Sequence, residues 1–230
     1  ARAGVDGFLA LDTEVPLPDF HIGEGIAVGT RIPTSWYDPT YNIVYWDCPG
    51  FGDPRGAEAD IVNAFSIQQL FQHPSQVKIV IAAEETDLRT RAPGFGALLN
   101  QLIETFPDNS QLEHCLSLVV TRQRDVDVLG ALGKIYADAE ENALFRIPRV
   151  KSLVKFLRDN VATRVSCMPY PTAAGAYVSN RASILASIAP EPVLNPDFNI
   201  FIPAESRLLV GQLSERINKE IADYIVGTVS

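Results

Sequence analysis

Short apolar runs alternate along the chain with longer stretches in which apolar residues recur at helical spacing. Apolar runs of strand length lie at 41–46, 77–83, 115–120 and 164–168. Helical spacing of apolar residues marks 57–72, 95–106, 128–145, 149–160, 176–188 and 206–227. This alternation predicts βαβ units, and therefore an α/β fold whose mostly parallel sheet carries helices on both faces. The run at 77–83 is almost entirely apolar, which predicts a strand buried on both faces.

Composition narrows the class of protein. Of the 230 residues, 47% are hydrophobic and 20% are charged, as in ordinary globular proteins, so extensive disorder is excluded. The net charge of −9 argues against a nucleic acid or an anionic membrane as the main partner. No apolar run approaches the roughly 20 residues needed to span a bilayer. The three cysteines are widely spaced and form no CxxC pair, which is typical of a reducing compartment. We therefore expect an intracellular, cytoplasmic protein, with any membrane association supplied by regions outside this sequence.

The segment 47–53 (DCPGFGD) follows a predicted strand and precedes a predicted helix. Ligands of parallel sheets bind at the carboxyl ends of the strands, which makes this loop a candidate site. A carboxylate such as Asp47 can hold a Mg²⁺-bound water there, and Gly50 can bring its backbone close to a phosphate. The alternative interpretation is an ordinary Pro-Gly turn closed by an aspartate.

The string WDCPGFGD at 46–53 resembles the switch II motif of P-loop GTPases of the TRAFAC class. It is most similar to the D-T-P-G-F-x-D form found in the septin-like and AIG1/Toc-like (paraseptin) branch. The resemblance implies a P-loop NTPase-like G domain with a three-layer fold, in which Asp47 reaches Mg²⁺ through water and Gly50 contacts the γ-phosphate. Cys48 replaces the usual threonine, and we interpret it as a packing residue.

Residues 25–34 (GIAVGTRIPT) resemble the switch I segment of the same branch, in which a threonine completes the Mg²⁺ shell. Thr30 and Thr34 both fit the distance before the strand. Thr30 is preferred because Gly29 before it suits a mobile loop. A surface loop without a ligand is the alternative for either threonine.

Residues 121–125 (TRQRD) follow the third predicted strand and resemble the [NT]-K-x-D loop that reads guanine. Thr121 and Arg122 match that pattern. Arg124 stands where the carboxylate is expected, and because arginine has donors only, it cannot accept the guanine N–H groups. A one-residue insertion would let Asp125 make that contact, and a plain polar loop is the alternative.

Two further segments complete the resemblance. Ser166, with Cys167 beside it, occupies the place of the fifth GTPase motif and is a candidate for backbone contact with the base. Residues 84–91 (EETDLRTR) correspond to a loop that the AIG1-like group uses in contacts between two G domains, which implies a homodimer. A solvated charged face is the alternative for this loop.

The phosphate-binding motif G-x-x-x-x-G-K-[ST] is absent from the 230 residues. In GTPases it precedes switch I, so we expect it upstream of Ala1. Residues 1–190 are then a G-like domain without that segment, and residues 191–230 a C-terminal helical extension.

The resemblance implies a switch protein that binds guanine nucleotide with Mg²⁺, as GTP or GDP. It should hydrolyse GTP slowly, because Phe51 stands where some GTPases place a glutamine. No catalytic residue is assigned. The first alternative is a catalytically inactive G-like scaffold, and the second is an unrelated doubly wound enzyme whose loop matches by coincidence.

Overall fold

The computed structural model describes residues 2–3, 9–10, 30, 32–39, 41–50, 55–72, 76–89, 92–125, 127–169, 181–188, 193–194 and 197–229. In chain order its elements are β1 (Arg2–Ala3), β2 (Leu9–Ala10), β3 (Thr34–Asp38), β4 (Ile43–Asp47), α1 (Ala57–Gln72), β5 (Gln76–Val77), β6 (Ile79–Glu84), α2 (Glu85–Arg89), α3 (Pro93–Thr105), α4 (Asn109–Cys115), β7 (Leu116–Gln123), α5 (Val128–Ala137), η1 (Ala139–Glu141), α6 (Pro148–Asp159), α7 (Val161–Arg164), β8 (Val165–Pro169), α8 (Arg181–Ser187), β9 (Val193–Leu194) and α9 (Ala204–Val229).

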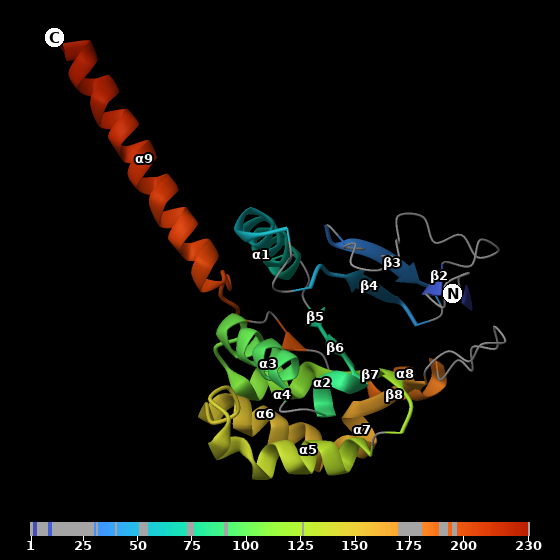
Figure 1. Cartoon of the computed structure of the whole chain (residues 1–230). Coiled ribbons are helices and arrows are strands. Elements are labelled where there is room, and N and C mark those ends of the chain that lie inside the picture. Colours follow the sequence, from blue (N-terminus) through green and yellow to red (C-terminus); the bar gives the residue numbers. More distant parts are fainter. Residues whose placement is uncertain are drawn as a thin grey trace.

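The fold is α/β, as the alternation of elements predicts. Strands β6, β7 and β8 form a parallel sheet with β7 in the centre. Strands β3 and β4 form a separate antiparallel pair, and Figure 1 shows this pair beside α1 and above the parallel sheet. The remaining described strands make two pairs of only two residues each, β1 with β2 and β5 with β9.

The predicted strand at 41–46 does not join the parallel sheet, which corrects the expectation of one mostly parallel sheet. It forms β4, and a short turn connects it to β3, with Thr34 opposite Asp47 and Asp38 opposite Ile43. A parallel neighbour would need a crossover connection of a dozen or more residues, whereas a short turn permits only antiparallel pairing. Asn42 in this turn has a φ of 53°, a conformation that asparagine tolerates well.

The burial of β6 also differs from the prediction. Ile81 and Ala83 are buried, but Val80 on the other face is 43% exposed and Ala82 is exposed as well. Burial on both faces is found instead in the central strand β7, from Leu116 to Val120. Helix α8 covers its second face, where Ser117 Oγ donates to the carbonyl of Ser187 over 2.7 Å.

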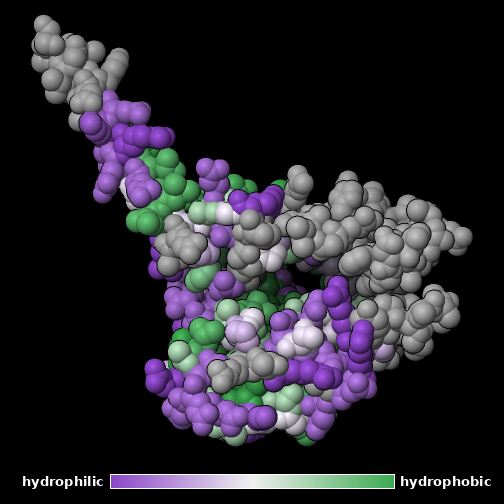
Figure 2. Space-filling view, viewed as in Figure 1, coloured by the Kyte–Doolittle hydropathy of each residue, from purple (hydrophilic) through white to green (hydrophobic). Residues whose placement is uncertain are grey.

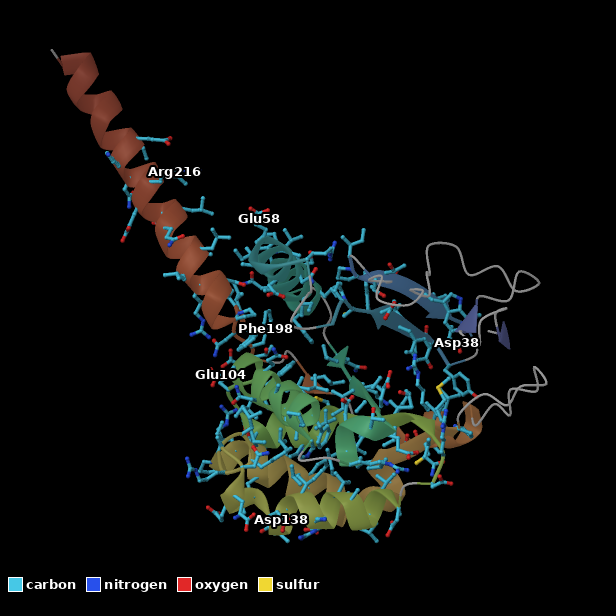
Figure 3. All side chains as sticks on the ribbon, in the orientation of Figure 1. Asp38, Glu58, Glu104, Asp138, Phe198 and Arg216 are labelled. Atoms are coloured by element: carbon cyan, nitrogen blue, oxygen red, sulfur yellow. The ribbon has the colours of Figure 1, made fainter. Side chains whose placement is uncertain are left out.

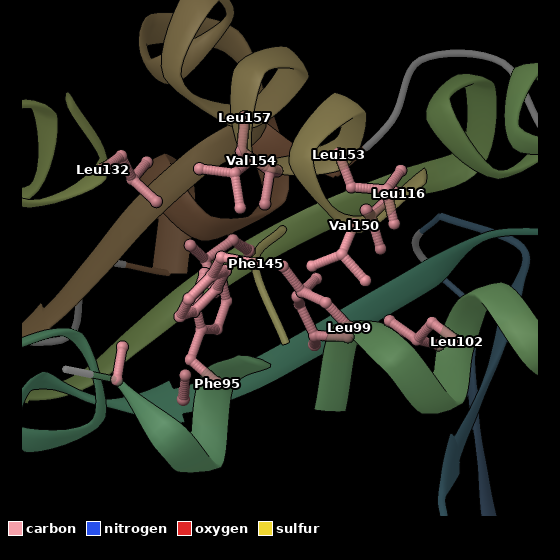
Figure 4. Close-up of a cluster of buried hydrophobic side chains, with 14 of the residues drawn as sticks. Phe95, Leu99, Leu102, Leu116, Leu132, Phe145, Val150, Leu153, Val154 and Leu157 are labelled. Atoms are coloured by element: carbon pink, nitrogen blue, oxygen red, sulfur yellow. The ribbon is translucent and has the colours of Figure 1, made fainter. Parts of the chain in front are cut away.

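The hydrophobic core lies between the inner face of the parallel sheet and helices α3, α5 and α6 (Figure 4). On α6 the residues Val150, Leu153, Val154 and Leu157 are at most 1% exposed, and their i, i+3, i+4, i+7 spacing places them on one face. The helix predicted at 128–145 is shorter than expected: α5 ends at Ala137, and η1 and a series of turns lead on to α6.

Helix α9 projects from the body of the molecule, and its base lies near α1 (Figure 1). Ser206 Oγ donates to Asp60 Oδ2 over 3.5 Å at this base. Leu208, Ile217 and Ile221 on α9 are 66%, 52% and 52% exposed, and Figure 2 shows hydrophobic and hydrophilic residues alternating along the same helix. In the described part of the chain, no helix is long and apolar enough to cross a membrane.

Candidate functional site

The structure brings Thr30 and Asp47 into direct contact. Asp47 is the last residue of β4, and its Oδ2 accepts a 2.6 Å hydrogen bond from Thr30 Oγ1. Both side chains are half-buried. A hydrogen bond to an ionised carboxylate is shorter and stronger than one between neutral groups, so this contact anchors the segment before β3 to the end of β4.

Thr34 and Gly50 lie on either side of this pair in the sequence. Thr34 is paired opposite Asp47 in the β3–β4 register, but its hydroxyl donates to the carbonyl of Ile32 over 3.3 Å. Gly50 is exposed, and a Cβ added there would have no atom within 4 Å. Of the two candidate threonines, Thr30 is the one that bonds to Asp47. The rest of the predicted switch I segment lies outside the described residues at 25–29 and 31, and the rest of the switch II segment lies outside them at 51–53.

Cys48 follows Asp47 directly. The residue is exposed, which argues against the packing role expected for it. Partial desolvation of its sulfur and the adjacent Asp47 carboxylate raise the pKa of the Cys48 thiol to about 11. The thiol is therefore protonated at neutral pH, and because the thiolate is the nucleophilic form, Cys48 is a poor nucleophile. All three cysteines are free.

A second group of predicted residues lies where β7 ends. Strand β7 runs on to Gln123, and a shift in its register with β8 falls between Val120 and Gln123. Arg122 lies within this irregularity, with a φ of 53° that places its backbone in the left-handed region. Its guanidinium pairs with Glu84 over 3.0 Å, and Thr121 Oγ1 donates to the carbonyl of Ala83 over 3.3 Å.

Glu85 is a residue of this group that the sequence analysis does not single out. The residue is 4% exposed, and its carboxylate accepts hydrogen bonds from the Arg89 side chain and from the backbone N–H of Arg124, with the N–H of Asp125 close enough to favour its charged form. Burial alone would raise the pKa of Glu85, but these hydrogen bonds and the positive charge of Arg89 outweigh it, so the pKa is lowered. Two acidic residues directly after an apolar strand were the available signal, because such residues lie at the carboxyl edge of the sheet.

Ser166 does not lie in a loop. It is inside β8, opposite Val119 of β7, and is 4% exposed. Its hydroxyl has no hydrogen-bond partner among the residues that the structure describes. Its neighbour Cys167 lies close to Glu85, since burial first and then the Glu85 carboxylate raise the pKa of that thiol. The strand ends only at Pro169, so Ser166 is not at the edge of the sheet where a ligand would bind.

The predicted residues thus form two groups on two different sheets. Thr30, Thr34 and Asp47 belong to the antiparallel pair, whereas Thr121, Arg122 and Asp125 belong to the carboxyl end of the parallel sheet. Within the described ranges, no three histidine, cysteine, aspartate or glutamate residues cluster in a way that could hold a metal ion. Mg²⁺ takes few protein ligands and keeps several waters, so one carboxylate and one hydroxyl are a chemically suitable set for it.

In comparisons with known proteins, no family profile matches this chain, and no curated protein or solved structure is significantly similar to it. A function for this protein is therefore inferred from the geometry at the end of β4 and at the end of β7, and from the motifs in those two places.

Proposed function

We propose that this protein is a GTP-binding switch protein of the P-loop GTPase type, with Mg²⁺ as its metal ion. The observation that carries the proposal is the 2.6 Å hydrogen bond between Thr30 and Asp47. Those two residues were assigned to one Mg²⁺ shell from two separate motifs, 17 positions apart in the chain. Their contact shows that the two oxygens lie close enough together to face one ion, which supports the proposal.

The side chains of this pair have the right chemistry for Mg²⁺. Hydroxyl and carboxylate oxygens are the hard donors that this ion prefers, and the metal would neutralise charge on the bound phosphates. In the structure the Thr30 hydroxyl donates to Asp47, so the residues before β3 are attached to the end of β4. A ligand that drew the Thr30 oxygen away from Asp47 would release this attachment. The switching step that we propose is the exchange of the Thr30 side chain between two partners, Asp47 and the bound ligand.

Gly50 is suited to sense the terminal phosphate of the nucleotide. Its exposed backbone has space around it, because an added Cβ would meet no atom within 4 Å. An anion can therefore approach its N–H without a steric barrier.

The loop at the end of β7 is the proposed reader of the base. The side chain of Asp125 is exposed, while its backbone N–H is held by the buried carboxylate of Glu85. An exposed carboxylate on an anchored backbone can accept the two N–H groups of guanine. The proposal requires the β3–β4 pair to lie with its Asp47 end beside this loop when nucleotide is bound.

The remaining parts of the proposal follow from the same resemblance. The parallel sheet would be the centre of a three-layer P-loop fold. Hydrolysis would be slow, and pairing of two G domains through residues 84–91 would regulate it. Of this segment the structure describes residues 84–89, as the end of β6 and helix α2.

One observation favours the inactive scaffold as a second candidate. The Arg122 guanidinium, which would pack over the base, is already paired with Glu84 in the structure. A scaffold that retains the sheet but binds no nucleotide would have no need to free this side chain.

Thermal unfolding separates these candidates. The protein is heated with and without GTP and Mg²⁺. Binding at a ligand concentration of 100 Kd stabilises a protein by about 2.7 kcal/mol, which raises Tm by several degrees. We expect Asp47→Asn to lose the Mg²⁺-dependent part of that rise.

Asp138→Asn is the matched control, because Asp138 is exposed on the far side of the molecule from the β3–β4 pair (Figure 3). It should keep the full rise in Tm. An identical Tm with and without GTP–Mg²⁺ in the unsubstituted protein would favour the scaffold.

A further inference from the structure

Two adjacent glutamates connect the end of β6 to the loop that follows β7. Glu84 is the last residue of β6 and pairs with the side chain of Arg122. Glu85 is the first residue of α2, and its carboxylate accepts the backbone N–H groups of Arg124 and Asp125. We call residues 122–125 the base loop. The two glutamates at the junction of β6 and α2 therefore hold this loop, Glu84 through the Arg122 side chain and Glu85 through the backbone.

The two contacts differ in burial, and so in strength. The side chains of the Glu84–Arg122 pair are 44% and 55% exposed, and ion pairs this exposed contribute little because water competes for both charges. Glu85 is buried, and its carboxylate is bonded to backbone donors as well as to Arg89. Removing a buried partner leaves its donors unsatisfied, which costs far more than losing an exposed pair. The base loop thus depends on Glu85 much more than on Glu84.

The base loop also has an unusual backbone that needs such a restraint. Arg122 has a φ of 53°, which a residue with a Cβ adopts only at a cost in free energy. A register shift between β7 and β8 falls at the same place, so Arg122 has no partner in that ladder, and pairing resumes with Gln123 opposite Pro169 at the end of β7. The hydrogen bonds from Arg124 and Asp125 to Glu85 provide the restraint directly after this point.

We propose that Glu85 is the positioning residue of the base loop: its carboxylate fixes the backbone of Arg124 and Asp125 so that the Asp125 side chain can accept a guanine base. This inference rests on the proposed function, because it assigns a role within base recognition. It also has a part that is independent of nucleotide, which is the fixing of the loop itself.

Amide hydrogen exchange in the whole protein without nucleotide tests that independent part. Glu85→Gln replaces one acceptor oxygen by an NH₂ group. Glu85→Asp keeps the charge beside Arg89 but shortens its reach, so a folded variant is available if the glutamine variant unfolds. Since bonds to a carboxylate are among the stronger hydrogen bonds, we expect the amides of Arg124 and Asp125 to exchange about tenfold faster in either variant.

Glu104→Gln is the matched control for this measurement, because Glu104 is exposed on α3 (Figure 3). It should leave exchange at Arg124 and Asp125 unchanged. If exchange at both amides is also unchanged in folded Glu85→Asp, Glu85 does not fix the loop and the inference is wrong.

Nucleotide competition tests the second part, with GTP and ATP as the probes. We expect the unsubstituted protein to prefer GTP, and Glu85→Asp to reduce that preference about tenfold while Mg²⁺-dependent triphosphate binding persists. A merely structural role would lower Tm without changing the ratio of the two affinities.

The outcomes separate the inference from the proposed function. If the unsubstituted protein binds neither nucleotide, the proposed function fails, while the exchange rates still decide whether Glu85 fixes the loop. If it binds GTP and Glu85→Asp keeps the full preference, the proposed function stands and the positioning role is overturned. Equal binding of GTP and ATP by the unsubstituted protein also overturns it.

Discussion

Replacing Thr30 by valine removes one hydroxyl group and keeps the branched shape of the side chain. That hydroxyl donates to Asp47 Oδ2 over 2.6 Å, and both residues are half-buried. Hydrogen bonds to charged groups contribute about 1.5–3 kcal/mol when they are well shielded, so with water competing for this carboxylate we expect about 1 kcal/mol. The free energy of unfolding should fall by that amount in Thr30→Val.

A double-mutant cycle isolates the contribution of this contact. Thr30→Val and Asp47→Ala are combined, because alanine removes the acceptor oxygen that asparagine would keep, and the coupling free energy between them should be about 1 kcal/mol. Urea unfolding followed by tryptophan fluorescence is a selective assay, because both tryptophans, Trp36 on β3 and Trp46 on β4, lie on the antiparallel pair.

Thr34→Val provides the control cycle. Its hydroxyl donates to the carbonyl of Ile32 over 3.3 Å and not to Asp47, although Thr34 lies directly opposite Asp47 in the register. Its coupling to Asp47 therefore reports cross-strand contact alone and should be clearly smaller than that of Thr30. Equal coupling of both threonines to Asp47, or none for Thr30, would refute the geometry on which the proposed function depends.

Three further predictions follow from single positions. Gly50→Ala should leave Tm unchanged without ligand, because an added Cβ would meet no atom of the described residues within 4 Å, but it should reduce the rise in Tm with GTP–Mg²⁺, because the methyl group would crowd a phosphate at the Gly50 N–H. Leu99→Ala should lower the free energy of urea unfolding by about 2–5 kcal/mol, since Leu99 is 0% exposed, whereas Leu208→Ala, at 66% exposure, should have almost no effect. The pKa of Glu85 is lowered from 4.5 in the folded state, so its contribution to stability is present above pH 4.5 and is lost as the pH falls through the folded pKa. Acid titration of Glu85→Gln should lack that part of the loss.

Helical segments with long periodic patterns could be predicted well from the sequence. The prediction at 57–72 coincides with α1, and that at 149–160 lies within one residue of α6 at each end. Helices α2 and α4 were not predicted, because five and seven residues are too few to show a 3.6-residue period.

Strand pairing could not be predicted in the same way. Whether a strand joins a parallel sheet depends on its partner, and the pattern of residues 41–46 alone does not identify β3 as that partner. The exposure of Val80 could not be predicted for the same reason, because it depends on which elements cover β6 and not on the residues of β6.

For the candidate site, the motif spacing predicted that Asp47 and either Thr30 or Thr34 belong together. In the structure Thr30 is the threonine that bonds to Asp47, and the role of either threonine toward a metal ion stays a prediction. Glu85 was missed because a buried carboxylate and a solvated one have the same letter in a sequence. Only its contacts with the backbone of Arg124 and Asp125 distinguish it. Ser166 lies within the strand predicted at 164–168, and β8 continues past it to Pro169, so its motif position falls inside the sheet and not at its carboxyl edge.

If the Thr30–Asp47 pair belongs to a site for Mg²⁺ and guanine nucleotide, GTP binding must depend on both Mg²⁺ and Thr30. Equilibrium titration with GTP, first with Mg²⁺ and then with excess EDTA, tests it most directly when the unsubstituted protein and Thr30→Val are measured side by side. The account predicts saturable GTP binding that weakens on removal of Mg²⁺ and a much smaller effect of Mg²⁺ in Thr30→Val. Absence of GTP binding, or binding that neither Mg²⁺ nor Thr30→Val alters, would contradict it.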